Sequence, residues 1–493
     1  MRTVLAIDQG TTGSTAIVFD DEGQVRGRAY SEFRQHYPRP GWVEHDAAEI
    51  WEVTRRVARE AAQAAGAEPE AIGITNQRET IVVWDRETGE PLHRAIVWQD
   101  RRTAARCREL SEAGHQEMIR RRTGLVIDPY FSGTKLEWLL ENDPELRRRA
   151  EAGEVAAGTV DAWLVHKLSG GARHVTDPTN ASRTLLYDID ALDWSDELLD
   201  LLGVPRAMLP EVAPSSGEFA VAAGEALGFE APVCGIAGDQ QAALFGQGCW
   251  HAGLAKQTFG TGAFLLLNTG AERVASEHGL LTTVACGPAG EAVYALEGSI
   301  FIAGAAVQWL RDELGVIETA PETQALAEAL ESNEGVYLVP AFVGLGAPHW
   351  DPEARGAIVG LTRGSGREHF ARAALEAMAY GTCEVLSAMI ADSGIQAREL
   401  AVDGGASLND WMVRFLAGIV GLPVRRPALV ETTALGAAGL AGIAAGVWRD
   451  ADHFLESRGE PSVFEPDMTR QERERLMDGW HRAVRAVRSY AAG

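Results

Sequence analysis

The sequence predicts an α/β protein with two domains. Apolar strand patterns alternate with helical ones, for example a helix over residues 47–65 followed by a strand over residues 71–74. With 493 residues the chain is longer than one hydrophobic core usually serves, so two domains are expected. Glycine-rich loops follow apolar strand patterns in both parts of the chain, at residues 10–13, 260–262 and 404–405.

The first of these loops opens the chain. A strand pattern over residues 4–7 ends in Asp8, and Gly-Thr-Thr-Gly follows at residues 10–13. Glycines let the backbone approach a phosphate closely, hydroxyls and N–H groups bind it, and a carboxylate at a strand end suits Mg²⁺. The same residues are typical of a β-hairpin turn, and the loop alone leaves both interpretations open.

The later elements continue the alternation. A strand carrying the second loop is predicted over residues 255–264, further strand sequence surrounds residues 280–296, and helices are predicted over residues 301–314 and 370–393. The apolar run at residues 434–448 is too short for a membrane span and contains four glycines, which favours a buried, closely packed helix. The sequence contains neither GxxxxGK[ST] nor a correctly placed GxGxxG.

Several longer segments match a known protein family and are more specific than any single glycine loop. They lie at residues 40–46, 73–80, 96–99, 124–135, 176–184, 235–246, 344–348 and 403–406. Over nearly its whole length the chain resembles the bacterial glycerol kinases of the FGGY carbohydrate kinase family. The resemblance implies two actin-like (ribonuclease-H-like) domains, residues 1–248 and 249–493, facing a central catalytic cleft. It also implies phosphorylation of glycerol to sn-glycerol 3-phosphate with ATP and Mg²⁺, the first step of glycerol catabolism.

Asp239 is the candidate catalytic base. It follows an apolar run at residues 233–236 and precedes a helical pattern at residues 240–245, which places its carboxylate at the end of a strand. The resemblance implies that Asp239 accepts the hydroxyl proton of the substrate, and that Asp8 and Asp239 hold the metal ion. Without the resemblance, an Asp at this position is typical of a helix cap.

The substrate site needs fixed donors and acceptors for three hydroxyls and one apolar wall for the carbon edge of glycerol. Arg78 and Glu79 would point to opposite sides of a regular strand, so the chain must turn if both reach the substrate. The alternative for such neighbours is a surface ion pair. The candidate substrate-binding residues are Arg78, Glu79, Trp98, Tyr130, Asp239, Gln240 and Phe264, of which Trp98 and Phe264 would form the wall.

The resemblance also implies the nucleotide site. It places one group of residues at the phosphates and another along the adenosine. Gly304 and Gln308 are four residues apart on one helical face, as a shared ligand requires and as ordinary helix packing also produces. The candidate nucleotide-binding residues are Thr11, Thr12, Gly13, Gly260, Thr261, Gly262, Gly304, Gln308, Gly404, Gly405 and Asn409.

The chain departs from the family pattern at two places. Well-studied members have an arginine where this chain has Thr15, so one cation expected near the transferred phosphate is missing. Some bacterial members bind fructose 1,6-bisphosphate through a Gly-x-Arg loop, and the corresponding stretch here is Gly228-Phe229-Glu230. Because the Glu230 carboxylate would repel a sugar phosphate, the sequence predicts insensitivity to that inhibitor.

Composition and charge restrict the partners. The net charge of −25 argues against a general nucleic-acid binder. Five cysteines without metal-binding spacing indicate free thiols in a reducing compartment, and the start of the chain leaves no room for a signal peptide. We therefore expect a cytoplasmic protein. By analogy with the family, we expect it to form a homodimer or a homotetramer.

Two other functions remain open. One is a kinase of the same family that acts on another polyol or ketose, such as xylulose, erythritol or a sugar acid. The other is an actin-like regulatory ATPase or a catalytically silent sugar sensor. The residues Asp8 and Asp239 argue against a silent protein, and the chain has no extension of the kind that binds peptides in chaperones.

Overall fold

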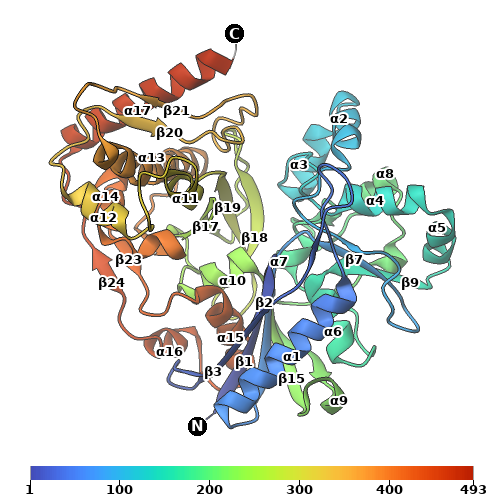
Figure 1. Ribbon diagram of the computed structural model, residues 1–493. Coiled ribbons are helices and arrows are strands. Elements are labelled where there is room, and N and C mark those ends of the chain that lie inside the picture. Colours follow the sequence, from blue (N-terminus) through green and yellow to red (C-terminus); the bar gives the residue numbers. More distant parts are fainter. Residues whose placement is uncertain (1, 492–493) are drawn as a thin grey trace.

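The computed structural model describes residues 2–491 and contains two large mixed sheets (Figure 1). The first sheet consists, in spatial order, of β14 (Ser216–Ala222), β15 (Ala231–Gly238), β6 (Ala71–Asn76), β1 (Thr3–Gln9), β2 (Gly13–Asp20) and β3 (Val25–Glu32). The second consists of β18 (Leu281–Cys286), β19 (Ala292–Ile300), β17 (Ala263–Gly270), β16 (Leu254–Phe259), β22 (Glu399–Asp403), β23 (Val424–Arg426) and β24 (Ser462–Phe464). The α/β class is confirmed.

Smaller sheets accompany the two large ones. One contains β4 (Gln35–His36), β5 (Glu44–His45), β8 (Ala95–Ile96), β7 (Ile81–Asp85) and β9 (Val155–Thr159). The pairs are β10 (Val175–Thr176) with β13 (Glu211–Val212), β11 (Tyr187–Asp188) with β12 (Asp193–Trp194), and β20 (Tyr337–Val339) with β21 (Ala357–Val359).

Helices surround these sheets. In the first half they are α1 (Ala47–Ala65), α2 (Ala104–Glu112), α3 (Gln116–Thr123), α4 (Gly133–Asn142), α5 (Pro144–Glu151), α6 (Val160–Leu168), α7 (Pro178–Ala181), α8 (Asp196–Leu202), α9 (Gly224–Leu227) and α10 (Asp239–Gly246). In the second half they are α11 (Gly304–Asp312), α12 (Glu322–Glu328), α13 (Arg367–Ser393), α14 (Asp410–Val420), α15 (Thr432–Ala444), α16 (Ala451–Glu456) and α17 (Arg470–Ala491). Two 3₁₀ helices span Arg206–Met208 and Gly405–Leu408.

The two large sheets repeat one strand order. In the first, β3, β2 and β1 form an antiparallel meander, and β6 and β15 follow in parallel to β1. In the second, β19, β17 and β16 form the meander, and β22 and β23 follow in parallel to β16. The loops at residues 10–12 and 260–262 therefore follow equivalent strands, β1 and β16.

These loops settle two expectations. The loop at residues 10–12 connects the antiparallel strands β1 and β2, so it is a hairpin turn, and a hairpin turn can also present N–H groups to a phosphate. The prediction of one strand over residues 255–264 is wrong, because the chain turns between β16 and β17. The Gly260 N–H donates to the Gly262 carbonyl at 2.8 Å, which closes that turn.

The first sheet is buried on both faces. On one face Leu5 and Ile7 pack with α1 and α6, and on the other Val4 and Ala6 pack with α10 and α15. Helix α15 follows the predicted domain boundary at a long distance in sequence, yet it packs against strands β1, β6 and β15. The boundary at residues 248/249 stays a prediction. Helix α15 comes after this boundary in sequence but lies beside the strands of the first sheet (Figure 1).

Helix α15 packs unusually closely. A Cβ atom on Gly436 would lie 1.8 Å from the Ala242 carbonyl oxygen of α10, so only glycine allows this approach. The apolar run at residues 434–448 therefore forms most of a buried helix, as the sequence predicts. None of the helices within residues 2–491 combines the length and hydrophobicity of a membrane span.

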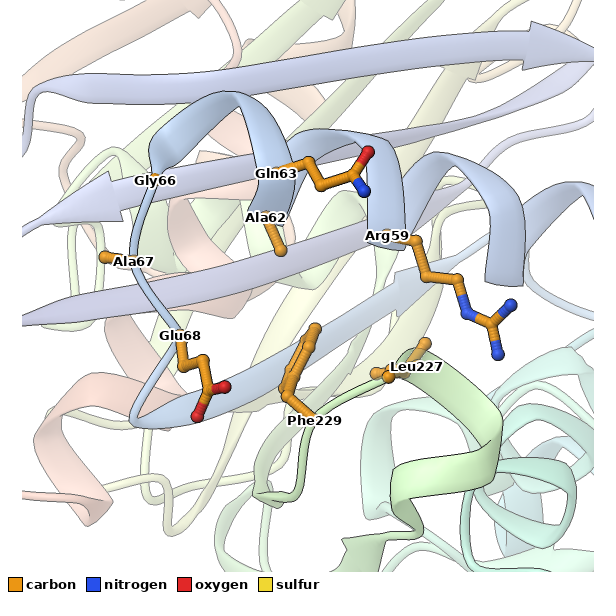
Figure 2. Close-up of a pocket in the computed structure, with 9 residues that line it drawn as sticks. Arg59, Ala62, Gln63, Gly66, Ala67, Glu68, Leu227 and Phe229 are labelled. Carbon is orange, nitrogen blue, oxygen red and sulfur yellow. The ribbon is translucent and has the colours of Figure 1, made fainter.

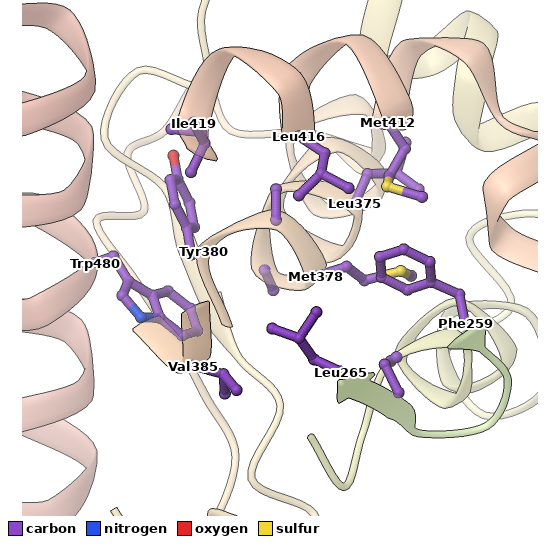
Figure 3. Packing of buried hydrophobic residues seen from close by; sticks show 14 of the residues in the cluster. Phe259, Leu265, Leu375, Met378, Tyr380, Val385, Met412, Leu416, Ile419 and Trp480 are labelled. Carbon is purple, nitrogen blue, oxygen red and sulfur yellow. The ribbon is translucent and has the colours of Figure 1, made fainter. Parts of the chain in front are cut away.

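The core of the second half surrounds α13 (Figure 3). Tyr380 of α13 stacks on Trp480 of α17, with ring centroids 5.3 Å apart, and Leu375 and Met378 pack beside Phe259 of β16. This core fixes the strand that leads into the second glycine loop.

Candidate active site

Arg78 and Glu79 lie in a turn after β6, and both are buried. Their side chains are 2% and 1% exposed, so they are not a surface ion pair. Glu79 has a backbone φ of 61°, in the left-handed region that non-glycine residues seldom adopt. The chain therefore turns here, as two converging side chains require, and Arg78 Nε lies 3.9 Å from Glu79 Oε1.

Two further buried side chains complete a ring of alternating charge. Arg78 donates to both carboxylate oxygens of Glu297 on β19, at 2.5 and 3.2 Å. Arg183, just after α7, donates to Glu79 Oε1 at 2.7 Å and to Glu297 Oε1 at 3.0 Å. We call Arg78, Glu79, Arg183 and Glu297 the charge ring.

Burial raises the pKa values of the two carboxylates in the charge ring, and the neighbouring arginines lower them. Burial alone would raise the pKa of Glu297, but Arg183 and Arg78 lower it to about 2. Burial raises the pKa of Glu79 above its usual value, an effect that Arg183 and Arg78 oppose. Glu297 is therefore the firmly ionised member of the charge ring.

Asp239 is the first residue of α10. Gly238 occupies the cap position, so the helix-cap interpretation of Asp239 is wrong. Asp239 Oδ1 accepts a hydrogen bond from the Gln240 N–H at 2.7 Å and lies 3.2 Å from Arg78 Nε. Its side chain is 35% exposed, so this carboxylate, next to the buried charge ring, stays accessible from outside.

Asp8 lies near the end of β1. Burial raises its pKa to about 7, and the negative charge of Asp239 adds to this shift. The negative charges of the two carboxylates repel each other. A divalent cation bound between them would neutralise both charges. Mg²⁺ takes carboxylate oxygens together with waters and phosphate oxygens, so Asp8 and Asp239 suit it chemically.

Aromatic rings stand next to these polar groups. Trp98 and Tyr130 meet edge to face with centroids 5.5 Å apart, and Trp98 Nε1 donates to Thr11 Oγ1 at 2.9 Å. Burial raises the pKa of Tyr130, so its hydroxyl keeps its proton. Phe264 on β17 pairs with Ser299, two residues beyond Glu297 on β19, which puts Phe264 and Glu297 on the same face of the second sheet.

Gln240 is also held from the second sheet. Its Oε1 accepts a hydrogen bond from Lys256 Nζ at 2.6 Å, and Lys256 is completely buried on β16. Burial lowers the pKa of Lys256, while Asp403 and Asp239 raise it. A cation from the second half therefore reaches the helix that carries Asp239.

A pocket of about 480 Å³ lies in the second half between the loop at residues 260–262, α11, α12 and the start of α14. Apolar side chains of Val307, Leu375 and Leu408 contribute to its lining. Six of the predicted nucleotide-binding residues line it: Gly260, Thr261, Gly304, Gln308, Gly405 and Asn409. The structure brings these six together.

The remaining predicted nucleotide residues lie outside this pocket. Gly262 closes the turn with Gly260, and Gly404, with φ of 84°, lies against the backbone of Phe259. Thr11, Thr12 and Gly13 belong to the β1–β2 hairpin of the first half. Asn409, which does line the pocket, caps α14 by accepting from the Met412 N–H at 3.0 Å, so its side-chain oxygen is already engaged.

Gly304 lies where α11 meets the loop at residues 260–262. Its N–H donates to the Gly260 carbonyl at 3.0 Å, and a Cβ atom on Gly304 would lie 2.6 Å from that oxygen. Only glycine lets α11 begin this close to the loop. The predicted pair of Gly304 and Gln308 therefore lines the pocket, with Gly304 acting through its backbone.

A second pocket, of about 620 Å³, lies between the end of α1 and the turn after α9 (Figure 2). Leu227, Gly228 and Phe229 line it from one side, and Arg59 and Glu68 contribute charges from the other. Glu230, which follows Phe229, is exposed. The predicted insensitivity to fructose 1,6-bisphosphate stays a prediction.

Sequence reasoning missed Arg183, Glu297 and Lys256. Arg183 lies in the segment at residues 176–184 that contributed to the family resemblance, but it received no role. Glu297 and Lys256 are single charges within apolar strands, a pattern that indicates a buried ion pair. That signal was available, although the partners of a buried charge cannot be read from the sequence.

Comparison with known proteins gives consistent matches. The N-terminal domain of the FGGY family of carbohydrate kinases matches residues 3–246, and its C-terminal domain matches residues 255–445. The chain is 56% identical over 490 residues to the glycerol kinase of Deinococcus radiodurans, covering 99% of this chain and 98% of that protein. It is 57% identical over 487 residues to glycerol kinase 2 of Thermotoga maritima, covering 98% of each.

A solved structure agrees in fold. The crystal structure of Plasmodium falciparum glycerol kinase with ADP is 35% identical and has a TM-score of 0.94, with 99% of this chain and 98% of that chain covered. The predicted two-domain α/β class is therefore confirmed.

Proposed function

The chain belongs to the FGGY family of carbohydrate kinases and, within it, to the glycerol kinases, and we propose that it transfers the γ-phosphoryl group of ATP to glycerol (EC 2.7.1.30). The products would be sn-glycerol 3-phosphate and ADP. The observation that carries the proposal is the convergence of Arg78, Glu79 and Asp239, which come from two separate segments, at one partly open position.

In this proposal Arg78 and Glu79 hold the hydroxyls of glycerol, with Tyr130 and Gln240 as further polar contacts. Trp98 and Phe264 enclose the carbon edge. A buried site whose polar groups are satisfied only by hydroxyls rejects ligands that lack them, because a wrong ligand leaves those groups unpaired.

Asp239 would accept the proton of the reacting hydroxyl. The hydroxyl oxygen would then form a bond to the γ-phosphorus, while the bond from that phosphorus to the oxygen of the β-phosphate breaks, in line, and ADP leaves. Most of the rate enhancement in such reactions comes from positioning and from neutralising charge on the phosphoryl oxygens.

The nucleotide would lie in the 480 Å³ pocket, with its adenosine beside Gly304, Gln308, Gly405 and Asn409. The loop N–H groups and hydroxyls of residues 11–13 and 260–262 would bind the phosphates from the two halves. Mg²⁺, held by Asp8 and Asp239, would neutralise phosphoryl oxygens when bound. These roles, a homo-oligomer and a cytoplasmic location complete the proposal.

A coupled ADP-release assay tests it, with MgATP and glycerol, dihydroxyacetone, xylulose or erythritol as acceptors. We expect preference for glycerol, and a decrease in kcat of about 10²–10⁴-fold in Asp239→Asn, which removes the base. Asp467→Asn, at an exposed position, is the matched control and should keep full activity. Preference for another acceptor would reassign the substrate, and ADP release without any acceptor would favour an ATPase.

A further inference from the structure

Two members of the charge ring, Arg183 and Glu297, have no role in the proposed reaction. Three members come from the first half of the chain, and Glu297 comes from β19 in the second sheet. The side chains of Arg183 and Glu297 are 0% exposed, so neither is available to solvent. Such a costly burial of charge calls for an explanation beyond packing.

Glu297 occupies two of the three guanidinium nitrogens of Arg78 and leaves Nε for other partners. Arg78 Nη1 and Nη2 both donate to the Glu297 carboxylate, at 2.5 and 3.2 Å. A guanidinium held by a carboxylate in this forked geometry has one orientation. Its Nε is then directed toward Asp239, 3.2 Å away, at the partly exposed end of the charge ring.

Arg183 orients the carboxylate of Glu79 in the same way that Glu297 orients the guanidinium of Arg78. Its Nε and Nη2 bridge Glu79 and Glu297, and its guanidinium carbon lies 5.3 Å from the ring centroid of Phe131. Both nearest contacts of Glu79, from Arg183 and Arg78, go to Oε1, which leaves Oε2 for a ligand hydroxyl. The carboxylate that Arg183 holds belongs to a residue with a left-handed backbone, since the φ of Glu79 is 61°.

We infer that Arg183 and Glu297 are positioning residues that complete the polyol site, Arg183 by orienting the Glu79 carboxylate and Glu297 by orienting the Arg78 guanidinium. The polyol site is thus built from both halves of the chain, although its predicted donors Arg78 and Glu79 belong to one half. This inference rests on the proposed function.

The test uses a charge-balanced double variant, Arg183→Gln/Glu297→Gln, in the full-length protein. Removing one charge of each sign leaves Arg78 and Glu79 paired, whereas a single change would leave an uncompensated buried charge. Circular dichroism and thermal unfolding report whether the variant is folded. We expect its KM for glycerol to rise about 10- to 100-fold, with the KM for MgATP within about twofold of wild type.

A second buried ion pair supplies the matched control. Arg372 and Glu376 of α13 pair at 2.8 Å, with side chains 10% and 3% exposed. Arg372→Gln/Glu376→Gln should lower the unfolding temperature and leave the KM for glycerol unchanged. If the charge ring is only structural, both double variants should behave alike, and a glycerol KM within twofold of wild type in the ring variant would overturn the inference.

Two conservative variants decide the matter if the double variant does not fold. Arg183→Lys keeps the charge but cannot bridge Glu79 and Glu297 at once, and Glu297→Asp keeps the charge but reaches less far. Each should raise the KM for glycerol at least fivefold without raising that for MgATP. Unchanged or equally raised KM values in both would overturn the inference.

Calorimetric titration of wild-type protein with glycerol separates this inference from the proposed function. Absence of glycerol binding and turnover in the wild type would refute the proposed function itself. Normal wild-type binding together with an unaltered glycerol affinity in the ring variant would refute only the positioning roles of Arg183 and Glu297.

Discussion

Thr15 is the cross-strand partner of Asp8 in the β1–β2 ladder, so their side chains lie on one face of the sheet. In the proposed site Thr15 would therefore lie beside the phosphates and the metal rather than beside glycerol. This matters because the family resemblance leads to the expectation of an arginine at this position, where the present chain has Thr15.

The variant Thr15→Arg should change kcat or the KM for MgATP and leave glycerol affinity within about twofold of wild type. A guanidinium beside Asp8 would favour the ionised carboxylate and would approach the phosphates. Steady-state kinetics with each substrate varied in turn measures this, and Thr15→Gln separates side-chain size from charge. If no constant changes in Thr15→Arg, position 15 has no part in the reaction.

Asp161 of α6 carries a testable pH dependence. Burial raises its pKa to about 7, and the charge of Asp177 adds to the shift, whereas an unfolded Asp has a pKa of about 3.9. The folded protein therefore binds this proton more tightly than the unfolded chain. The stabilisation from protonation is complete below pH 4 and is lost as the pH rises through 7.

The variant Asp161→Asn cannot ionise, so it should be more stable than wild type at pH 8, and this difference should shrink as the pH falls to 5. Chemical denaturation at several pH values measures the difference in unfolding free energy. The exposed Asp467→Asn should show no such trend. A difference that is the same at pH 5 and pH 8 would contradict the assignment.

At the scale of elements, the contact between α15 and α10 depends on Gly436. The variant Gly436→Ala places a Cβ atom 1.8 Å from the Ala242 carbonyl, so it should lower the unfolding free energy by about 1–3 kcal/mol. Gly381 in α13 is the control, because its added Cβ atom would lie 3.5 Å from the Ile300 side chain, an ordinary contact.

Gly381→Ala should change stability by about 1 kcal/mol or less, since alanine also favours the helix. Urea unfolding followed by circular dichroism compares the two variants. Equal stability of Gly436→Ala and wild type would show that the two helices can separate without cost.

The sequence predicted regular elements better than the contacts between them. Helix α1 has the predicted bounds because its apolar periodicity, the Asp46 cap and the terminal Gly66 all agree. The strand predicted over residues 255–264 was wrong because β-type residues continue on both sides of a glycine turn. Arg183 and Glu297 were missed because their pairing joins residues 114 apart.

The turn at Glu79 was predicted in part: the sequence indicated that the chain turns there, but not which groups hold the turn. The need for a turn followed from two neighbouring side chains that had to converge, and the structure confirms it. What holds Glu79 in the left-handed region is a set of distant groups, among them the Ser132 hydroxyl, which donates to the Glu79 carbonyl at 2.8 Å. Local patterns carry no information on such groups.

At the scale of the whole molecule, the first half is incomplete without α15. Residues 1–248 expressed alone would expose the face of the sheet that contains Val4, Ala6, Ile17 and Phe19. We expect this fragment to aggregate or to lack a cooperative thermal transition. Joining residues 430–448 to it through a flexible linker should improve solubility and restore a transition, which calorimetry and near-ultraviolet circular dichroism would detect.

The matched control joins the same linker to a copy of residues 430–448 in which Leu435 and Leu440, both buried in the whole protein, are changed to Ser. It should not restore the transition. A cooperative transition in residues 1–248 alone would contradict a structural requirement for α15.

The position of α15 also has a consequence in time. A ribosome adds about 5–20 residues per second, so α15 emerges roughly ten to forty seconds after α10 has been made. During that interval the first sheet can form its hydrogen bonds while the part of its apolar face that α15 covers stays open. The first sheet can therefore bury this part of its surface only after residues 432–444 have been synthesised.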